Sequence, residues 1–142
     1  MDFDEAAARY HEAASTFAKG DPEPVKALFS RREDVMLANP FGPAVSGWTA
    51  VSAALDHASS NFRDGEVTAF VRVADYRSKD LVSIHETEQW RAKVAGRTET
   101  TEFVLRVTST FRLEDDTWKL VHRHADPIST AHPEGPLRGP GE

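Results

Sequence analysis

The chain has 142 residues, enough for one hydrophobic core but too few for two. Its net charge of −6 disfavours nucleic-acid binding, because phosphates need a concentrated basic face, and no apolar run approaches the roughly 20 residues that span a bilayer. The acidic start, residues 1–5, lacks the basic region of a signal peptide, and the absence of cysteine excludes disulfides and thiolate chemistry. We therefore expect a cytoplasmic protein that binds neither nucleic acid nor membrane.

Two helices are predicted at the start of the chain. Apolar residues recur at helical spacing over residues 3–17, and Gly20 is a suitable stop. Asp21 as N-cap and Pro22 at the first helical position then predict a short second helix. We expect it to turn three apolar residues inward: Val25, Leu28 and Phe29.

A short strand over residues 34–39 should follow, ended by Pro40 and by turn chemistry at Gly42-Pro43. From about Trp48, apolar residues through Phe62 are spaced as in a third helix, which residues 63–65 would close.

The rest of the domain is predicted to be a sheet. Segments rich in Val, Thr, Ile and Phe cover residues 66–77, 81–94, 98–113 and 118–125. The turns between these segments, at residues 78–80, 95–97 and 114–117, are too short for the crossovers that join parallel strands. These four strands should therefore form an antiparallel meander. The sequence thus predicts an α+β fold: a cone-shaped roll of three N-terminal helices packed on a strongly bent antiparallel (mixed) sheet.

Apolar residues occupy both parities of the long strands: Phe103, Leu105, Val107 and Phe111 on one, Val82, Ile84 and Trp90 on the other. On this pattern both sheet faces need cover, and we expect a homodimer through the outer face. The domain should span residues 1–127. Residues 128–142, rich in Pro and Gly, read as an irregular tail.

The order of these elements and three short segments resemble the nuclear-transport-factor-2-like superfamily, in its SnoaL-like and ketosteroid-isomerase-like branch. The segments are residues 18–21, residues 39–48 with Asn-Pro-Phe-Gly and Gly-Trp, and residues 111–124. The resemblance implies one pocket in the cone, with Asn39 at its mouth. It does not fix the reaction, because this fold carries isomerases, cyclases, hydrolases, dehydratases and association domains.

The resemblance also shows what the chain lacks. Asn39 stands where the steroid isomerases have their general-base aspartate, and an amide cannot take up a proton at neutral pH. Their oxyanion-hole tyrosine and aspartic acid fall on Ala13 and Ser109, with Tyr10 one turn away as a weak substitute. Classical ketosteroid isomerase activity is therefore not expected.

The last strand carries the other candidate catalytic residues. Strict alternation puts Arg123 on one face and His122, His124 and Asp126 on the other, and local hydrophobicity does not decide which face is inward. An inward Arg123 would hold a carboxylate or enolate oxygen, unless it pairs with Glu86 or Glu88 of a neighbouring strand.

Inward histidines beside Asp126 would instead form an acid/base pair, unless they serve a core or an interface. His122, His124 and Asp126 also have metal-ligand spacing, but the chain has no cysteine and no second histidine pair in register. We predict no metal and no cofactor.

Further candidates for the pocket are Tyr10, Phe17, Phe41, Trp48, Glu88 and Ser109. Asn39 would polarise a carbonyl or orient a water there, or would merely cap the strand before Pro40 in an Asx turn.

Three functions remain open on the sequence. The first is a cofactor-independent isomerase, cyclase or hydratase that acts on a small, largely apolar, carbonyl-containing molecule. The second is a ligand-binding module without chemistry. The third is a dimerisation domain whose cavity is filled by Phe17, Phe29, Trp48 and Phe62.

Overall fold

The computed structural model describes residues 2–131. In chain order the elements are α1 (Phe3–Phe17), α2 (Glu23–Leu28), β1 (Met36–Asn39), β2 (Gly42–Ser46), α3 (Trp48–Ser59), β3 (Phe62–Arg77), β4 (Leu81–Val94), β5 (Thr100–Glu114) and β6 (Thr117–Asp126). The strands form one sheet in the order β2-β1-β6-β5-β4-β3. All neighbouring strands are antiparallel except β1 and β6, which run parallel.

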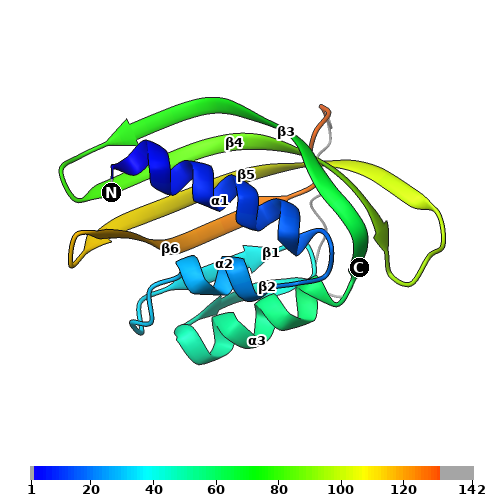
Figure 1. The fold of residues 1–142 in the computed structure, drawn as a ribbon, viewed down its shortest axis with the longest axis horizontal. Helices are drawn as coiled ribbons and strands as arrows, with labels where there is room; N and C mark the ends of the chain where they lie inside the picture. The colour runs from blue at the N-terminus through cyan, green and yellow to red at the C-terminus, as the bar shows by residue number, and fades with distance from the viewer. Residues whose placement is uncertain (1, 132–142) are drawn as a thin grey trace.

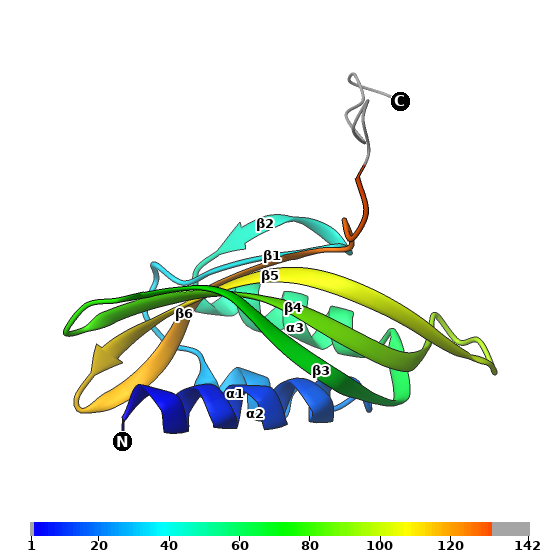
Figure 2. The same cartoon turned by 90° about the horizontal axis from the view of Figure 1, so that it is seen from above.

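The three helices lie on one side of the sheet, and the long strands bend around them (Figures 1 and 2). This arrangement confirms the predicted α+β cone and makes the sheet mixed. The antiparallel meander of the four long strands is also as predicted, while β1 pairs in parallel with β6 and extends the sheet beyond the meander.

Helix α1 follows the prediction closely, because its apolar stripe is long and regular. Asp2 caps its start by accepting a hydrogen bond from the Glu5 N–H at 2.9 Å. Gly20 follows its end with a φ of 100°, which glycine adopts without strain. The helix turns Phe3, Tyr10 and Phe17 into the core, among other residues.

Helix α2 begins at Glu23, one residue later than predicted, and Pro22 takes the N-cap position. Asp21 still accepts the Glu23 N–H at 3.0 Å, but it does so from a turn ahead of the helix. Phe29 is buried as expected, although it lies just past the helix and bridges to Leu120 of the last strand.

The segment predicted as a turn at Gly42-Pro43 is strand β2. Proline lacks the N–H that a central strand needs, so its presence indicated a turn. However, β2 is the edge strand of the sheet, where one row of backbone N–H groups has no partner strand and proline is tolerated.

The boundary after α3 also differs from the prediction, since α3 ends at Ser59 and Phe62 begins β3. Gly65, expected to close the helix, lies within this strand and donates its N–H to the Ala18 carbonyl at 3.1 Å. A Cβ at Gly65 would lie 2.5 Å from the Ala92 Cβ and 2.6 Å from the Ala18 oxygen. This glycine therefore permits the end of α1 to pack against the bend of β3.

The inner face of the sheet contains both apolar sets that the sequence assigned to opposite faces. Trp90 pairs with Phe103, and Val82 pairs with Phe111, so both pairs point to the same side. Because of the length of the loop between them, even-numbered residues of β4 lie opposite odd-numbered residues of β5. The prediction that odd and even residues of different strands lie on opposite faces was therefore wrong. The original reason for a dimer through the outer face therefore does not hold.

Within residues 2–131, no helix is long and apolar enough to cross a membrane. The predicted tail, 128–142, falls mostly outside the described residues.

Candidate functional site

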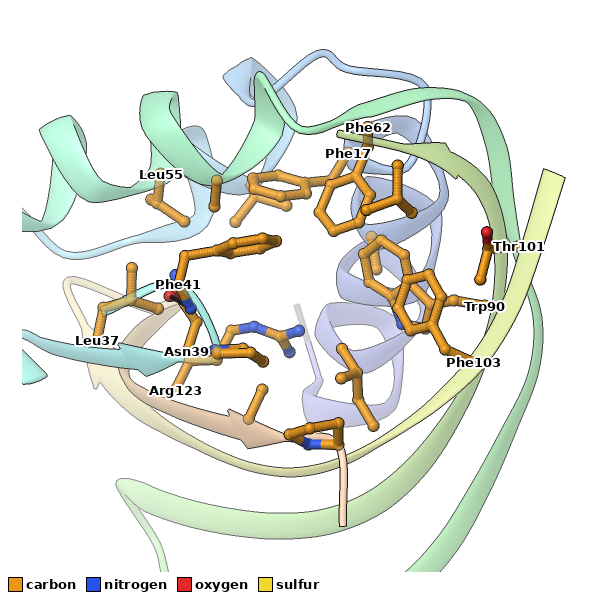
Figure 3. Close-up of a pocket in the computed structure, with 18 of the residues that line it drawn as sticks. Phe17, Leu37, Asn39, Phe41, Leu55, Phe62, Trp90, Thr101, Phe103 and Arg123 are labelled. Atoms are coloured by element: carbon orange, nitrogen blue, oxygen red, sulfur yellow. Dashed lines mark hydrogen bonds between the residues drawn. The ribbon is translucent and has the colours of Figure 1, made fainter. Parts of the chain in front are cut away.

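A cavity of about 260 Å³ lies between the helices and the inner face of the sheet. Its walls come from α1, α2, α3, β1 and the long strands, and Pro40 and Pro127 contribute from the ends of β1 and β6. Six aromatic side chains line it: Tyr10, Phe17, Phe41, Phe62, Trp90 and Phe103. They surround an open space in Figure 3, so the aromatic residues of this fold do not fill its cavity.

The aromatic wall is continuous from α1 to β5. The Phe103 ring stacks on Phe62 at a centroid distance of 6.0 Å and on Trp90 at 5.7 Å. Phe41 meets Phe62 edge-on at 5.7 Å, and Phe17 meets Trp90 edge-on at 6.5 Å. Offset and edge-on pairs are the favoured arrangements of aromatic rings, so this wall is well packed.

Arg123 reaches the cavity because β6 contains a β-bulge. Thr110 pairs with His122, whereas Phe111 pairs with Leu120, so Val121 is an extra residue. The bulge reverses the alternation, and Leu120 and Arg123 both face inward although their parities differ. Figure 3 shows the Arg123 guanidinium extending from β6 into the space between the aromatic rings.

The Arg123 guanidinium belongs to a buried polar cluster. Its Nη1 and Nη2 donate to the two carboxylate oxygens of Glu88, each at 3.3 Å, and Nη1 also donates to the Tyr10 hydroxyl oxygen. Tyr10 donates its own proton to Glu88, and the Trp90 Nε1–H donates to the same carboxylate at 3.0 Å. Glu88 is fully buried on β4, behind the cavity wall.

This cluster fixes the protonation of Tyr10 and Arg123. Burial raises the pKa of the Tyr10 phenol well above its usual range, so Tyr10 is neutral. Burial disfavours the Arg123 charge, but the Glu88 carboxylate and Tyr10 outweigh it and raise the pKa of Arg123. Arg123 thus stays cationic, and Glu88 balances its charge.

The cluster also determines which N–H groups of Arg123 have no partner in the protein. A guanidinium has five N–H groups, and the contacts with Glu88 and Tyr10 use three of them. The Nε–H and one Nη2–H have no partner among residues 2–131. The Tyr10 hydroxyl has a single proton, which it donates in a hydrogen bond to Glu88. Tyr10 therefore does not replace the oxyanion-hole tyrosine of the isomerases.

Asn39 lies at the pocket as expected, at the end of β1. Its Oδ1 accepts the Phe41 N–H at 3.0 Å, which is the Asx turn that the sequence offered as an alternative. Its Nδ2 remains as a second donor beside the cavity. Tyr10, Phe17 and Phe41 are also placed at the pocket, in agreement with the candidate set.

His122, His124 and Asp126 lie on the opposite face of the sheet. They pair across the strands with Thr110, Thr108 and Arg106, and none of the three lines the cavity. The Asp126 carboxylate instead accepts the Arg106 Nε–H at 2.7 Å. Burial, aided by His124, lowers the pKa of His122, which keeps it neutral at pH 7. The bulge at Val121 is the reason that these side chains point away from the pocket.

The other three candidates are also placed away from the cavity lining. Trp48 packs on Phe29 and beneath the Arg31 guanidinium, 3.6 Å from its ring centroid. Glu88 supports the pocket from behind, and Ser109 is buried next to Arg123 in the sheet register. No group of three or more His, Asp or Glu side chains in the described range is arranged to hold a metal ion.

The lining residues outside the predicted candidate set include four from one end of the sheet: Trp90, Arg97, Thr101 and Phe103. All four lie on β4, β5 or the loop that joins them. The signal for Trp90 and Phe103 was their cross-strand pairing, which requires the loop length to within one residue.

Solved structures share this fold over most of the chain. A nuclear-transport-factor-2-like superfamily protein from Salmonella enterica has a TM-score of 0.74 and 20% identity, covering 92% of each chain. A ketosteroid isomerase-like protein from Erwinia carotovora has a TM-score of 0.72 and 18% identity, covering 89% of this chain and 94% of that one. A proposed dehydratase of the NTF2-like family from Streptomyces avermitilis has a TM-score of 0.69 and 21% identity, covering 90% of this chain and 94% of that one.

At such identities these structures show the fold alone, and no curated protein matches the chain. The model of the SnoaL-like domain matches residues 4–128, which include every helix and strand described above except the first residue of α1. The chain therefore belongs to the SnoaL-like domain family, and it shares its fold with nuclear-transport-factor-2-like proteins.

Proposed function

We propose that this protein binds a small, largely apolar molecule through an oxygen acceptor such as a carbonyl. The observation that supports the proposal is the buried Arg123 guanidinium, which lines an aromatic cavity and keeps two N–H groups without a partner among residues 2–131. Such pockets, mostly apolar with a few fixed polar groups, are typical small-molecule sites. The volume of about 260 Å³ lies just below their usual range of about 300–1,000 Å³, which favours a small ligand.

The chemistry of the lining supports a ligand that accepts hydrogen bonds. Arg123 and the Asn39 amide both offer N–H donors, and the Asn39 oxygen is occupied by Phe41. No Asp, Glu or His of residues 2–131 lines the cavity. A ligand oxygen thus has donors to meet, while a ligand cation has no carboxylate to pair with at the surface of the cavity.

The test is a titration by NMR of the 15N-labelled protein with aryl methyl ketones and with their ethylbenzene analogues. We expect the ketones to bind more tightly and to shift the Arg123 Nε–Hε signal. Ala58→Leu fills the cavity and should abolish binding, whereas Ala53→Leu, exposed on the same helix, should not. Equal binding of ketone and hydrocarbon, or binding that survives Ala58→Leu, would disprove the proposal.

A second candidate is cofactor-independent proton transfer next to a bound carbonyl, as in an isomerase, cyclase or hydratase. The observation that favours it is the same pair of Arg123 N–H groups, which would stabilise an enolate oxygen in a water-poor site. The base would have to come from the substrate or from water, because the described lining offers none. This predicts faster exchange of the ketone's α-protons in D2O than with the double variant Glu88→Gln/Arg123→Met. No difference between the two proteins would exclude it.

Steroid isomerisation is not part of this proposal. Asn39 cannot act as the base, and Ala13 and Ser109 replace the oxyanion-hole residues. Rapid conversion of a 5-ene-3-ketosteroid would contradict this assignment of the residues.

We also propose a homodimer through the outer sheet face, now on a different observation. Val71 and Tyr76 are 50% and 70% exposed, and their partners in β4 place them on that face. Apolar side chains exposed on adjacent stretches of a sheet favour association. A monomeric mass by light scattering at micromolar concentration would exclude the dimer, and Val71→Asp with Tyr76→Asp should disrupt it.

A further inference from the structure

The cavity has two guanidinium groups, and they stand in different electrostatic situations. Arg123 is 11% exposed and pairs with Glu88, which is 0% exposed. Arg97 is exposed, lines the same cavity, and forms no ion pair or side-chain hydrogen bond within residues 2–131. One cation is therefore already balanced, and the other is available.

The backbone of the β4–β5 loop places Arg97 at the mouth. Ala95 and Gly96 have φ values of 55° and 75°, so the chain reverses sharply, and the Arg97 N–H then bonds the Val94 carbonyl at 3.2 Å. Thr101 follows on β5 and also lines the cavity. The loop thus holds a cationic and a hydroxyl side chain beside the opening that faces solvent.

The charges of the lining favour an anion at the mouth. Arg97 and Arg123 are the charged side chains among the described lining residues, and both are positive. Because Glu88 cancels Arg123, the uncompensated charge is that of Arg97. This local positive charge occurs in a chain whose net charge is −6.

We propose that the ligand is an amphiphilic carboxylate with a second, neutral oxygen, and that Arg97 selects its anionic end. The carboxylate lies at the mouth against Arg97, the apolar middle lies between the aromatic rings, and a carbonyl oxygen accepts from Arg123. This inference rests on the proposed function and adds the substrate class, the ligand's orientation and the specificity-determining residue Arg97.

The opposite orientation is disfavoured by the buried Glu88 carboxylate. An anion on Arg123 would lose its hydration and would lie near Glu88, where the low dielectric strengthens like-charge repulsion. At the mouth, the carboxylate keeps part of its hydration and meets a guanidinium that no carboxylate of residues 2–131 occupies.

The experiment compares three compounds that share one aromatic ring. 4-(4-Acetylphenyl)butanoate has both oxygens, its methyl ester lacks the charge, and 4-(4-ethylphenyl)butanoate lacks the carbonyl. Each is titrated by NMR into the wild-type protein, into Arg97→Gln, and into Arg9→Gln as the control. Arg9 is an exposed arginine on α1 that does not line the cavity.

We expect Arg97→Gln to weaken binding of the keto acid by up to about fivefold, the range of an exposed ion pair. Binding of the ester should not change, and Arg9→Gln should affect neither compound. The loss should shrink at high salt, because salt screens an exposed pair. The Arg123 Nε–Hε signal should respond to the two ketones and not to the ethyl compound.

Two results would overturn the inference while leaving the proposed function intact. One is an equal effect of Arg97→Gln on acid and ester. The other is a shift of the Arg123 signal by the ethyl compound, which would place the carboxylate inside the cavity next to Arg123. If none of the three compounds perturbs any lining residue of the wild-type protein, the proposed function itself fails.

Discussion

At the scale of single residues, Glu88 decides what Arg123 can do. The carboxylate compensates the charge of the buried guanidinium and accepts hydrogen bonds from the Tyr10 hydroxyl and the Trp90 N–H. Four side chains from α1, β4 and β6 therefore act as one unit. The cost of burying two charges is offset by these hydrogen bonds. The two remaining N–H groups of Arg123 are thereby fixed in direction before any ligand arrives.

Glu88→Gln should destabilise the protein by about 3 kcal/mol, because it leaves a buried guanidinium without a counter-charge. The measurement is the free energy of unfolding in urea. The control is Glu66→Gln, which breaks an exposed pair with Arg91 and should cost less than about 1 kcal/mol. The double variant Glu88→Gln/Arg123→Met should recover part of the lost stability. Equal losses of stability in Glu88→Gln and Glu66→Gln would contradict the view that the four side chains act as one unit.

At the scale of elements, the β-bulge and the bend of β3 shape the cone. Val121 lets β6 present Leu120 to the core and Arg123 to the cavity, which strict alternation forbids. Gly65 lets the end of α1 approach the sheet where β3 bends. A glycine is required at this contact because a Cβ would be too close to its neighbours. Backbone conformation is not the reason, because the φ of Gly65 lies outside the left-handed region.

Gly65→Ala should therefore destabilise the protein by about 1–3 kcal/mol, the usual cost of overpacking. Gly42→Ala is the matched control, because a Cβ there meets nothing within 4 Å. That substitution should be neutral or should stabilise by up to about 1 kcal/mol, through a less flexible unfolded chain. Thermal unfolding of both variants checks this, and equal melting temperatures would contradict it.

At the scale of the whole molecule, ion pairs connect elements that are distant in the sequence. Asp34 receives two hydrogen bonds from Arg112 at 2.7 and 3.0 Å, which joins the segment before β1 to β5. Arg72 and His11 both contact Glu86, which joins β3 and α1 to β4. The bond from Arg112 lowers the pKa of Asp34. Burial opposes ionisation of Glu86, but His11 and Arg72 outweigh it and lower its pKa.

These lowered pKa values predict acid sensitivity. The unfolded chain takes up protons at about pH 4, before the folded protein does, so stability is full above that pH and falls as the pH drops below it. Urea midpoints measured from pH 7 to pH 3 should show this loss. Glu86→Gln should lower stability at pH 7 and flatten the acid limb, and an unchanged limb would show that Glu86 is not ionised in the folded state.

The extent to which the sequence predicted this molecule follows from the range of each signal. Helix α1 and strand β4 were placed correctly because their patterns are local and long. Arg123 remained ambiguous, since a one-residue bulge has no clear sequence signature. Arg97 was missed because its role depends on where a loop lies relative to the end of β1, some sixty residues away in the chain.

The central claim is that the aromatic cavity binds a carbonyl oxygen on Arg123. The most direct test is a crystal structure of the protein soaked with 4-(4-acetylphenyl)butanoate. Our account predicts density between Phe62, Trp90 and Phe103, with the ketone oxygen within about 3.2 Å of an Arg123 nitrogen. A cavity without the compound, or a ketone oxygen turned away from Arg123, would contradict it.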